Sequence, residues 1–217
     1  MIKFENVTAT YKKNIGVFNI SFEVDSGNMV FIMGPTGAGK STILKTIYKD
    51  MLVNSGSIIL DNENITSINS NIHTSSIRKK IGMIFQDFKL LPDYTVFENI
   101  ALPLRIEGYS KNKIIELVQE SLNKIGLPQR QSSYPLQLSG GEQQRVCIAR
   151  ALVKKPKIIL ADEPTGNLDP NISDDILDLL EMCTDSGSTV LMSTHNFPLI
   201  KPRKKRFVEL SNGRIID

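Results

Sequence analysis

The chain has 217 residues, 41% of them hydrophobic and 23% charged, with a formal net charge of +3. This length suits one domain that buries its own core, and the composition excludes a disordered or low-complexity chain. The small positive charge is too weak to predict nucleic-acid binding, so no nucleic-acid partner is expected.

Cysteine usage and apolar patterning bear on the compartment. Cys147 and Cys183 have no metal-binding spacing and cannot form a disulfide framework, which favours a reducing compartment. The start MIKFENV lacks a signal-peptide pattern, and the longest apolar run, MVFIM at 29–33, is far shorter than the about 20 residues that cross a bilayer. We therefore expect a cytoplasmic protein that reaches a membrane only through a partner.

The first elements predicted along the chain are strands. MIKFENVTATY and VFNISFEV alternate and are expected to be antiparallel, whereas NMVFIM is apolar throughout and suits a strand buried on both faces. STILKTIYKDML at 41–52 predicts a helix, and SGSIILDNENI at 55–65 predicts a strand and a turn. Residues 77–102 are expected to pass from a strand into a loop and then into a helix.

The rest of the chain predicts helices followed by alternating strands and helices. KNKIIELVQESLNKIGL at 111–127 has helical apolar spacing ended by Gly126 and Pro128, so residues from about 87 to 150 are expected to be largely helical. PKIILADE and STVLMSTH predict strands on either side of the helix SDDILDLLEMCTD, and RFVELSNGRIID predicts a final hairpin. Such alternation favours an α/β fold with a largely parallel sheet.

The stretch GPTGAGKST at 34–42 carries the most specific chemistry. It matches G-x-x-x-x-G-K-[ST] between a buried strand and a helix, which a chance glycine-rich turn would not explain. The glycines let backbone N–H groups point at phosphate oxygens, Lys40 supplies a charge for the β- and γ-phosphates, and Ser41 offers a hydroxyl to Mg²⁺. The residues expected to hold ATP here are Gly34, Pro35, Thr36, Gly37, Ala38, Gly39, Lys40, Ser41 and Thr42.

KIILADEP at 157–164 is an apolar strand that ends in two acids. Unpaired charge beside a buried strand is unfavourable and needs a reason. Asp162 would complement Mg²⁺, usually through water, and Glu163 would polarise an attacking water as a general base. The plain alternative is that both carboxylates are solvated at the strand end.

Three further side chains are candidates for the same site. His195 ends the strand STVLMST and can donate a hydrogen bond to a γ-phosphate, and Gln86 in MIFQDF ends another strand and can ligate Mg²⁺ or hold water. Tyr11 precedes the phosphate loop and can stack on adenine. The structural alternatives are a polar strand terminus for His195 and a packed core aromatic for Tyr11.

A second glycine loop, LSGGEQQR at 138–145, also leads into a helix start that attracts anions. The order Gly34–Thr42, Gln86, Leu138–Glu142, Asp162–Glu163 and His195 resembles the nucleotide-binding domain of the ABC transporter ATPases over essentially the whole chain. NLD at 167–169 matches the D-loop of that family.

This resemblance implies an α/β fold of the P-loop NTPase type with a RecA-like core, an N-terminal antiparallel β-subdomain and an inserted helical lobe. The single domain 1–217 would divide into a core lobe, 1–86 and 151–217, and a helical lobe, 87–150, that carries the signature loop.

The resemblance also implies an ATP-dependent homodimer. Ser139, Gly140, Gly141 and Glu142 of one copy would cap the γ-phosphate held by the other, and Asp169 would help to link the two sites. The catalytic set would be Glu163, His195, Lys40 and Gln86, and the metal set Ser41, Gln86 and Asp162.

Within the family, MIKFENV, GMIFQDFKLLPDYTVFENIALPL, LSGGEQQRVCIARAL and LADEPTGNLD resemble a bacterial branch that acts in cell division. That branch drives an integral membrane partner, which activates peptidoglycan hydrolases, so the chain is expected on the inner face of the cell membrane. ATPases of lipoprotein release and macrolide efflux share ADEPTGNLD and are the alternative. A soluble DNA-repair or translation protein would carry two cassettes or coiled-coil inserts, and Glu163 argues against a switch without hydrolysis.

Three local features leave alternatives open. Asn196 follows His195 where the family usually has Asp. The stretch after Gln86 is expected to expose Phe88, Leu90 and Leu91 to the membrane partner, unless they belong to the helical core. KPRKKR at 201–206 is either a solvated turn or a contact for anionic lipid headgroups.

Overall fold

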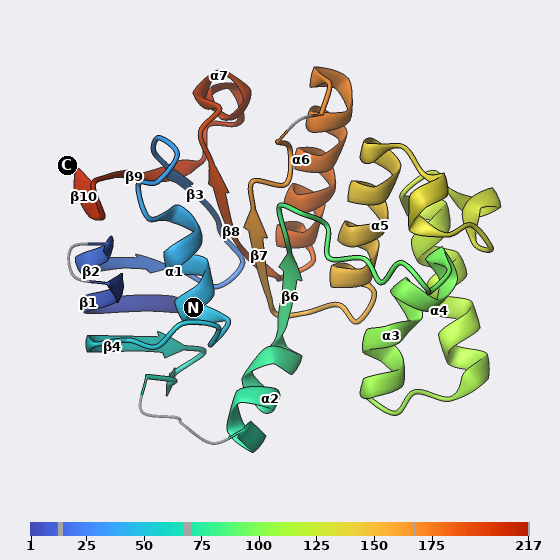
Figure 1. Ribbon diagram of the computed structural model, residues 1–217, viewed down its shortest axis with the longest axis horizontal. Coiled ribbons are helices and arrows are strands. Elements are labelled where there is room, and N and C mark those ends of the chain that lie inside the picture. The colour runs from blue at the N-terminus through green and yellow to red at the C-terminus, as the bar shows by residue number, and fades with distance from the viewer. Residues whose placement is uncertain (13–14, 67–70, 167, 217) are drawn as a thin grey trace.

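The computed structural model describes residues 1–12, 15–66, 71–166 and 168–216, whose strands form two sheets (Figure 1). The first sheet has the strand order β2-β1-β4-β5 and is antiparallel. Its strands are β1 (Ile2–Lys12), β2 (Ile15–Val24), β4 (Ser55–Leu60) and β5 (Glu63–Asn64). The alternation in β1 and β2 buries one side chain in two, as a sheet with one buried face requires.

The second sheet has the strand order β10-β9-β3-β8-β7-β6 and is parallel except for β10. Its strands are β3 (Met29–Met33), β6 (Ile81–Ile84), β7 (Ile158–Asp162), β8 (Thr189–Thr194), β9 (Arg206–Ser211) and β10 (Arg214–Ile216). The three central strands β3, β8 and β7 are almost wholly buried because apolar layers cover both faces. Their carboxyl ends share one edge, which therefore receives the residues after 33, 162 and 194.

Helices cover the parallel sheet on both faces. The helices are α1 (Lys40–Ile47), α2 (Asn71–Lys80), α3 (Val96–Ile106), α4 (Lys111–Lys124), α5 (Gly140–Leu152), α6 (Pro170–Asp185) and α7 (Phe197–Ile200). One apolar cluster joins α1 to the facing sides of both sheets, and a second joins α5 and α6 to the other face of the parallel sheet. A third cluster packs α3 and α4 against α5, at the right of Figure 1. These observations confirm the α/β fold, the antiparallel N-terminal strands and the final hairpin; Asp217 of that hairpin lies outside the described residues.

Two predicted boundaries are wrong, and a contact between the two segments explains the end of α1. Residues 77–80 belong to α2 and not to a strand, and the helix expected over 41–52 ends at Ile47. Lys49 has a left-handed φ of 59°, and Arg78 of α2 donates from Nε to Tyr48 O (3.0 Å) and from Nη2 to Lys49 O (3.1 Å). A side chain about thirty positions away thus binds the free carbonyls at the end of α1, which sequence periodicity does not report.

None of the helices in the described ranges is both long enough and apolar enough to cross a bilayer.

Candidate functional site

The phosphate loop lies between β3 and α1 at the carboxyl edge of the parallel sheet. Gly37 and Gly39 have φ values of 83° and 105°, which side chains rarely adopt. A Cβ on Gly39 would come within 2.6 Å of Val17 Cγ1, whereas a Cβ on Gly37 would meet nothing within 4 Å. The loop therefore packs against β2 at Gly39 and leaves open space at Gly37, as a binding site for phosphate requires.

Lys40 begins α1 and is almost fully buried beneath this loop. Its Nζ donates to Gly34 O (2.8 Å) and Pro35 O (3.1 Å) and lies 3.1 Å from Glu163 Oε1. The charge is thus paired and hydrogen-bonded, which a buried ammonium needs. All three partners are oxygen atoms, so phosphate oxygens can take their place.

The two acids at the end of β7 face the phosphate loop. Asp162 Oδ1 accepts from Ser41 Oγ (2.9 Å) and from Ser193 Oγ (2.7 Å). Glu163 has a left-handed φ of 44°, and its N–H lies 3.0 Å from Ser193 Oγ and 3.2 Å from Ser193 O. This unusual backbone turns the Glu163 carboxylate toward Lys40, and strained residues of this kind concentrate at functional sites.

His195 reaches the same carboxylate from β8, since its Nδ1 lies 3.0 Å from Glu163 Oε2. The ring is more than half exposed, so Nε2 can face a ligand. Asn196 Oδ1 accepts from Leu199 N (3.2 Å) and caps α7, a position that Asn and Asp fill equally well. The departure from the usual Asp therefore leaves this turn intact.

Several of these residues line a pocket of about 280 Å³, although Asp162 and His195 are not among its lining residues. Its lining includes Tyr11, Thr36, Gly37, Gly39, Lys40, Ser41, Thr42, Gln86 and Glu163. Gln86 is exposed at the end of β6, and Tyr11 is 54% exposed, with Lys45 Nζ 5.8 Å from its ring centroid. The alternative that Tyr11 is a packed core aromatic is wrong, since the ring is exposed and lines the pocket.

The signature loop forms a second, separate structure at the start of α5. Ser139 Oγ accepts from Glu142 N (3.3 Å), and Glu142 Oε2 accepts from Ser139 N (2.8 Å), which is a complete capping box. The Ser139 N–H lowers the pKa of the Glu142 carboxyl below its ordinary value. Ser139 and Gly140 are exposed, and none of the described residues 139–142 lines the pocket around Lys40.

The predicted D-loop is described only in part, because Asn167 lies outside the described residues. Asp169 Oδ1 accepts from Ile172 N (3.0 Å) and caps α6. A Cβ on Gly141 would come within 3.0 Å of Ile172 Cδ1, so the signature loop lies beside the start of α6.

Two surface expectations need correction. Phe88 and Leu90 are partly buried against the apolar clusters, so of the three residues expected to be exposed only Leu91 is, together with Tyr94. In the basic run, Arg203 is mostly buried: it binds Asp174 (Nη2–Oδ1, 2.8 Å) and Asp178 of α6. The run is therefore not a uniformly solvated turn.

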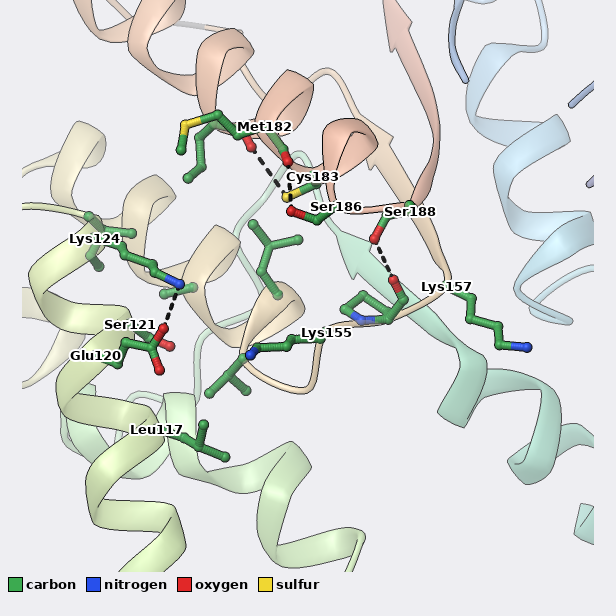
Figure 2. A pocket seen from close by; sticks show the side chains of 17 residues that line it. Leu117, Glu120, Ser121, Lys124, Lys155, Lys157, Met182, Cys183, Ser186 and Ser188 are labelled. Atoms are coloured by element: carbon green, nitrogen blue, oxygen red, sulfur yellow. Dashed lines mark hydrogen bonds and ion pairs between the residues drawn. The ribbon is translucent and has the colours of Figure 1, made fainter. Parts of the chain in front are cut away.

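A larger pocket of about 410 Å³ lies elsewhere, between the ends of α4, α5 and α6 (Figure 2). Pro156, Lys157 and Ser188 line it, just before β7 and β8 begin, so it sits at the amino edge of the parallel sheet. Ligands of open α/β sheets bind at the carboxyl edge, which favours the smaller pocket as the nucleotide site.

Sequence reasoning missed Ser193 and Arg150. The Ser193 hydroxyl bonds both to the Asp162 carboxylate and to the Glu163 N–H. In the sequence, the feature that could have indicated this role is a polar residue inside an apolar strand, two positions before His195. Arg150 donates to the carbonyls of Phe88 and Lys89, a tertiary contact that no local pattern announces.

A parallel sheet whose carboxyl edge carries a phosphate loop, two acids and a separate capped glycine loop defines a nucleotide-binding cassette. Comparison with known proteins agrees with this class. The model of the ABC transporter family matches residues 17–166, and the chain belongs to that family. It is an ATPase.

Named relatives cover nearly the full chain. The cell division ATP-binding protein FtsE of Escherichia coli K12 is 45% identical over 99% of this chain and 97% of its own length. FtsE of Bacillus subtilis 168 is 41% identical over 100% of this chain and 95% of its own length. A solved structure, the dimeric post-hydrolysis state of the ATP-binding cassette MJ0796 bound to ADP and Pi, has a TM-score of 0.91. It is 36% identical and covers 100% of this chain and 97% of that chain.

Proposed function

We propose that this ATPase works as a head-to-tail pair that sandwiches two ATP molecules and drives an FtsX-type membrane protein in cell division. The observation that supports it best is that Lys40, Ser41 and Glu163 line one pocket, with Asp162 bonded to Ser41, while none of the described residues 139–142 lines that pocket. Two copies then complete two sites, which is the arrangement an isologous dimer requires.

The phosphate loop and Tyr11 hold the nucleotide. Backbone N–H groups of Gly34–Thr42 and the start of α1 face the phosphates, and Tyr11 stacks on the base at the pocket mouth. Lys40 exchanges its carbonyl and carboxylate partners for β- and γ-phosphate oxygens. Because Lys40 is already buried, binding desolvates no further lysine charge, but the phosphates must displace its ion pair with Glu163.

Oxygen ligands around Ser41 fit Mg²⁺. The Ser41 hydroxyl already meets the Asp162 carboxylate at 2.9 Å, and the Gln86 amide lines the same pocket. Hydroxyl, amide and carboxylate oxygens are the donors that this small cation prefers. When bound, Mg²⁺ would neutralise charge on the phosphates.

Glu163 is the proposed general base and accepts a proton from the attacking water. His195 and Gln86 orient the γ-phosphate and that water, and Lys40 stabilises the developing charge. Ser193 fixes the Glu163 backbone, so the carboxylate is positioned before the substrate arrives.

The signature loop is the proposed grip on the other copy's ATP. The Ser139 hydroxyl accepts from Glu142 N and retains its own proton, so it can still donate to a γ-phosphate. The free N–H groups of Gly140 and Gly141 and the helix dipole add to this attraction, and the Glu142 carboxylate is held back by Ser139 and Arg130. Asp169, which caps α6 near the signature loop, is proposed to connect the two sites.

Two lobes are proposed to move relative to one another, a core lobe (1–86 and 151–217) and a helical lobe (87–150). Leu91 and Tyr94 on the helical side are the exposed apolar residues nearest Gln86 in sequence and are assigned to the membrane partner. With this partner, the protein is proposed to work on the inner face of the cell membrane, while the partner activates peptidoglycan hydrolases outside.

The relatives named FtsE support the division role, and depletion in cells tests it. Loss of the chain should give filaments with failed septa, and the tagged chain should retain a four-span membrane protein in a pull-down. Intact division together with recovery of a lipoprotein-release or macrolide-efflux permease would replace this function with the alternative.

A further inference from the structure

The segment after Gln86 has an unusual backbone. Phe88 and Lys89 have φ values of 60° and 49°, and two successive left-handed residues other than glycine are rare. Phe88 N donates to Phe85 O (3.2 Å) and Lys89 N to Asp87 O (2.6 Å), so the turn is tight. Such a conformation persists only where its surroundings hold it.

Arg150, in the last turns of α5, holds this turn. Its Nη1 donates to Lys89 O (2.6 Å) and its Nη2 to Phe88 O (2.7 Å). Two carbonyls are thus gripped by one planar guanidinium, a geometry that the single ammonium of lysine cannot reproduce. In Figure 1 the green segment between β6 and α3 passes beside α5.

The next part of the segment is bound to α3. The buried Asn99 accepts from Leu91 N (2.8 Å) through Oδ1, and its Nδ2 donates to the carbonyls of Leu91, Tyr94 and Thr95. The segment 88–95 is therefore attached by side chains to α5 and α3, whereas Gln86 continues directly from β6 of the core sheet. Gln86 lies at the junction between the two.

The helix α5 connects the signature loop at its start with the turn after Gln86 near its end. Ser139 caps its first turn, where the proposed function places the γ-phosphate of the second copy, and Arg150 grips the turn next to Gln86 of the same chain. A rigid helix of 13 residues moves as one body, so a shift at its start is carried to its end.

We propose that Arg150 is a positioning residue that transmits the position of the signature helix to Gln86. This role depends on the function proposed above: ATP held by one copy pulls on α5 of the other, and Arg150 then moves the turn that sets Gln86 in that other pocket. The two ATP sites of the dimer consequently depend on each other.

The test uses the purified full chain and three variants. Arg150→Met removes the guanidinium, Arg150→Lys keeps the charge without the fork, and Arg105→Met changes an exposed arginine of α3 as a control. ATP hydrolysis is measured against ATP concentration, ATP affinity is measured in dilute protein, and hydrogen exchange is followed at residues 86–90 and 34–42 with and without ATP. Thermal melting verifies that each variant folds.

In the wild type and in Arg105→Met, the Hill coefficient should exceed 1, with an upper limit of about 2 for two sites. Both Arg150 variants should lose this cooperativity. Their kcat should fall by about tenfold because a misplaced Gln86 no longer orients the attacking water, while ATP affinity changes less than about twofold. ATP should still protect 34–42 from exchange but no longer protect 86–90.

The inference is overturned if Arg150→Met keeps the wild-type Hill coefficient and kcat, if Arg150→Lys restores both, or if the folded wild type shows no ATP-dependent protection at 86–90. A wild type that neither dimerises nor hydrolyses ATP would instead refute the proposed function, and this role of Arg150 with it. A cooperative wild type with a cooperative Arg150→Met refutes only the role of Arg150.

Discussion

Lys40 Nζ lies 3.1 Å from Glu163 Oε1, so the cation assigned to the γ-phosphate is paired with the carboxylate assigned to the attacking water. A phosphate that approaches Lys40 must compete with Glu163 and is also repelled by it. In the proposed mechanism the same carboxylate therefore opposes ATP binding electrostatically and serves as the base for turnover.

Replacing Glu163 by Gln should separate these two effects. Turnover should fall by about 10²–10⁴-fold because the general base is lost. ATP should bind more tightly because repulsion and competition are removed, and a dimer should accumulate with ATP in size-exclusion chromatography. Glu209→Gln, an exposed acid on β9, is the control and should behave as the wild type. Normal hydrolysis by Glu163→Gln would refute the base assignment.

Ser139 caps α5 and is assigned to the second copy's γ-phosphate, and two substitutions distinguish these roles. Ser139→Ala should lower the free energy of unfolding by about 1 kcal/mol because the cap is lost. Ser139→Asp should preserve the cap, since Asp is a good N-cap, yet abolish ATP-induced dimerisation because its carboxylate repels phosphate. Urea unfolding and light scattering with ATP measure the two quantities. A dimerising Ser139→Asp would contradict the role in phosphate binding.

The ionised Glu142 should stabilise the fold in a pH-dependent way. Its pKa lies below the ordinary 4.5 because Ser139 N–H donates to the carboxylate, so its contribution is present above about pH 4.5 and is lost as pH falls through the folded-state value. The free energy of unfolding of the wild type should exceed that of Glu142→Gln near neutral pH, by less than about 1 kcal/mol at this partly exposed site. Urea unfolding should show the difference shrinking as the pH falls below about 4.5. A difference that stays constant with pH would exclude the charge as its source.

The basic run 201–206 should be tested without Arg203, which binds α6. Changing Lys201, Lys204 and Lys205 together to Gln should reduce sedimentation with vesicles containing anionic phospholipid, because each basic residue near such a surface contributes about 1 kcal/mol. Neutral vesicles are the control for charge. Unchanged binding to anionic vesicles would show that these lysines do not contact lipid.

Arg203→Met should instead destabilise the fold, since it leaves Asp174 and Asp178 without their partner.

The parts of the fold that sequence predicts well are those with local causes. The runs MVFIM, IILAD and TVLMST have to be strands buried on both faces, and the phosphate loop lies within nine consecutive residues. The acids Asp162 and Glu163 follow from their place at a strand end. Each of these depends on neighbours in the chain, so no tertiary knowledge is needed.

The features that sequence does not predict depend on contacts between residues that are far apart in the chain. The end of α1 depends on Arg78, and the position of Arg203 depends on acids of α6. NIHTSSIRKK, which forms α2, has a weak apolar pattern, and its tertiary contacts come from the buried Ile77 and from Arg78. Ser193 acquires its role only when β8 lies beside β7, an adjacency that strand patterns alone leave undetermined.

The close packing of the phosphate loop has a consequence for the timing of synthesis. Gly34 packs so closely on Leu210 that a Cβ would lie 2.3 Å from Leu210 O, and Gly213 N donates to Ala38 O at 3.1 Å. A ribosome that has translated the whole GPTGAGKST stretch must still add about 170 residues before Leu210 and Gly213 can pack against the loop. The nascent chain therefore acquires its grip on nucleotide late, and a shortened product that lacks β9 and β10 keeps every proposed catalytic side chain yet should not retain ATP.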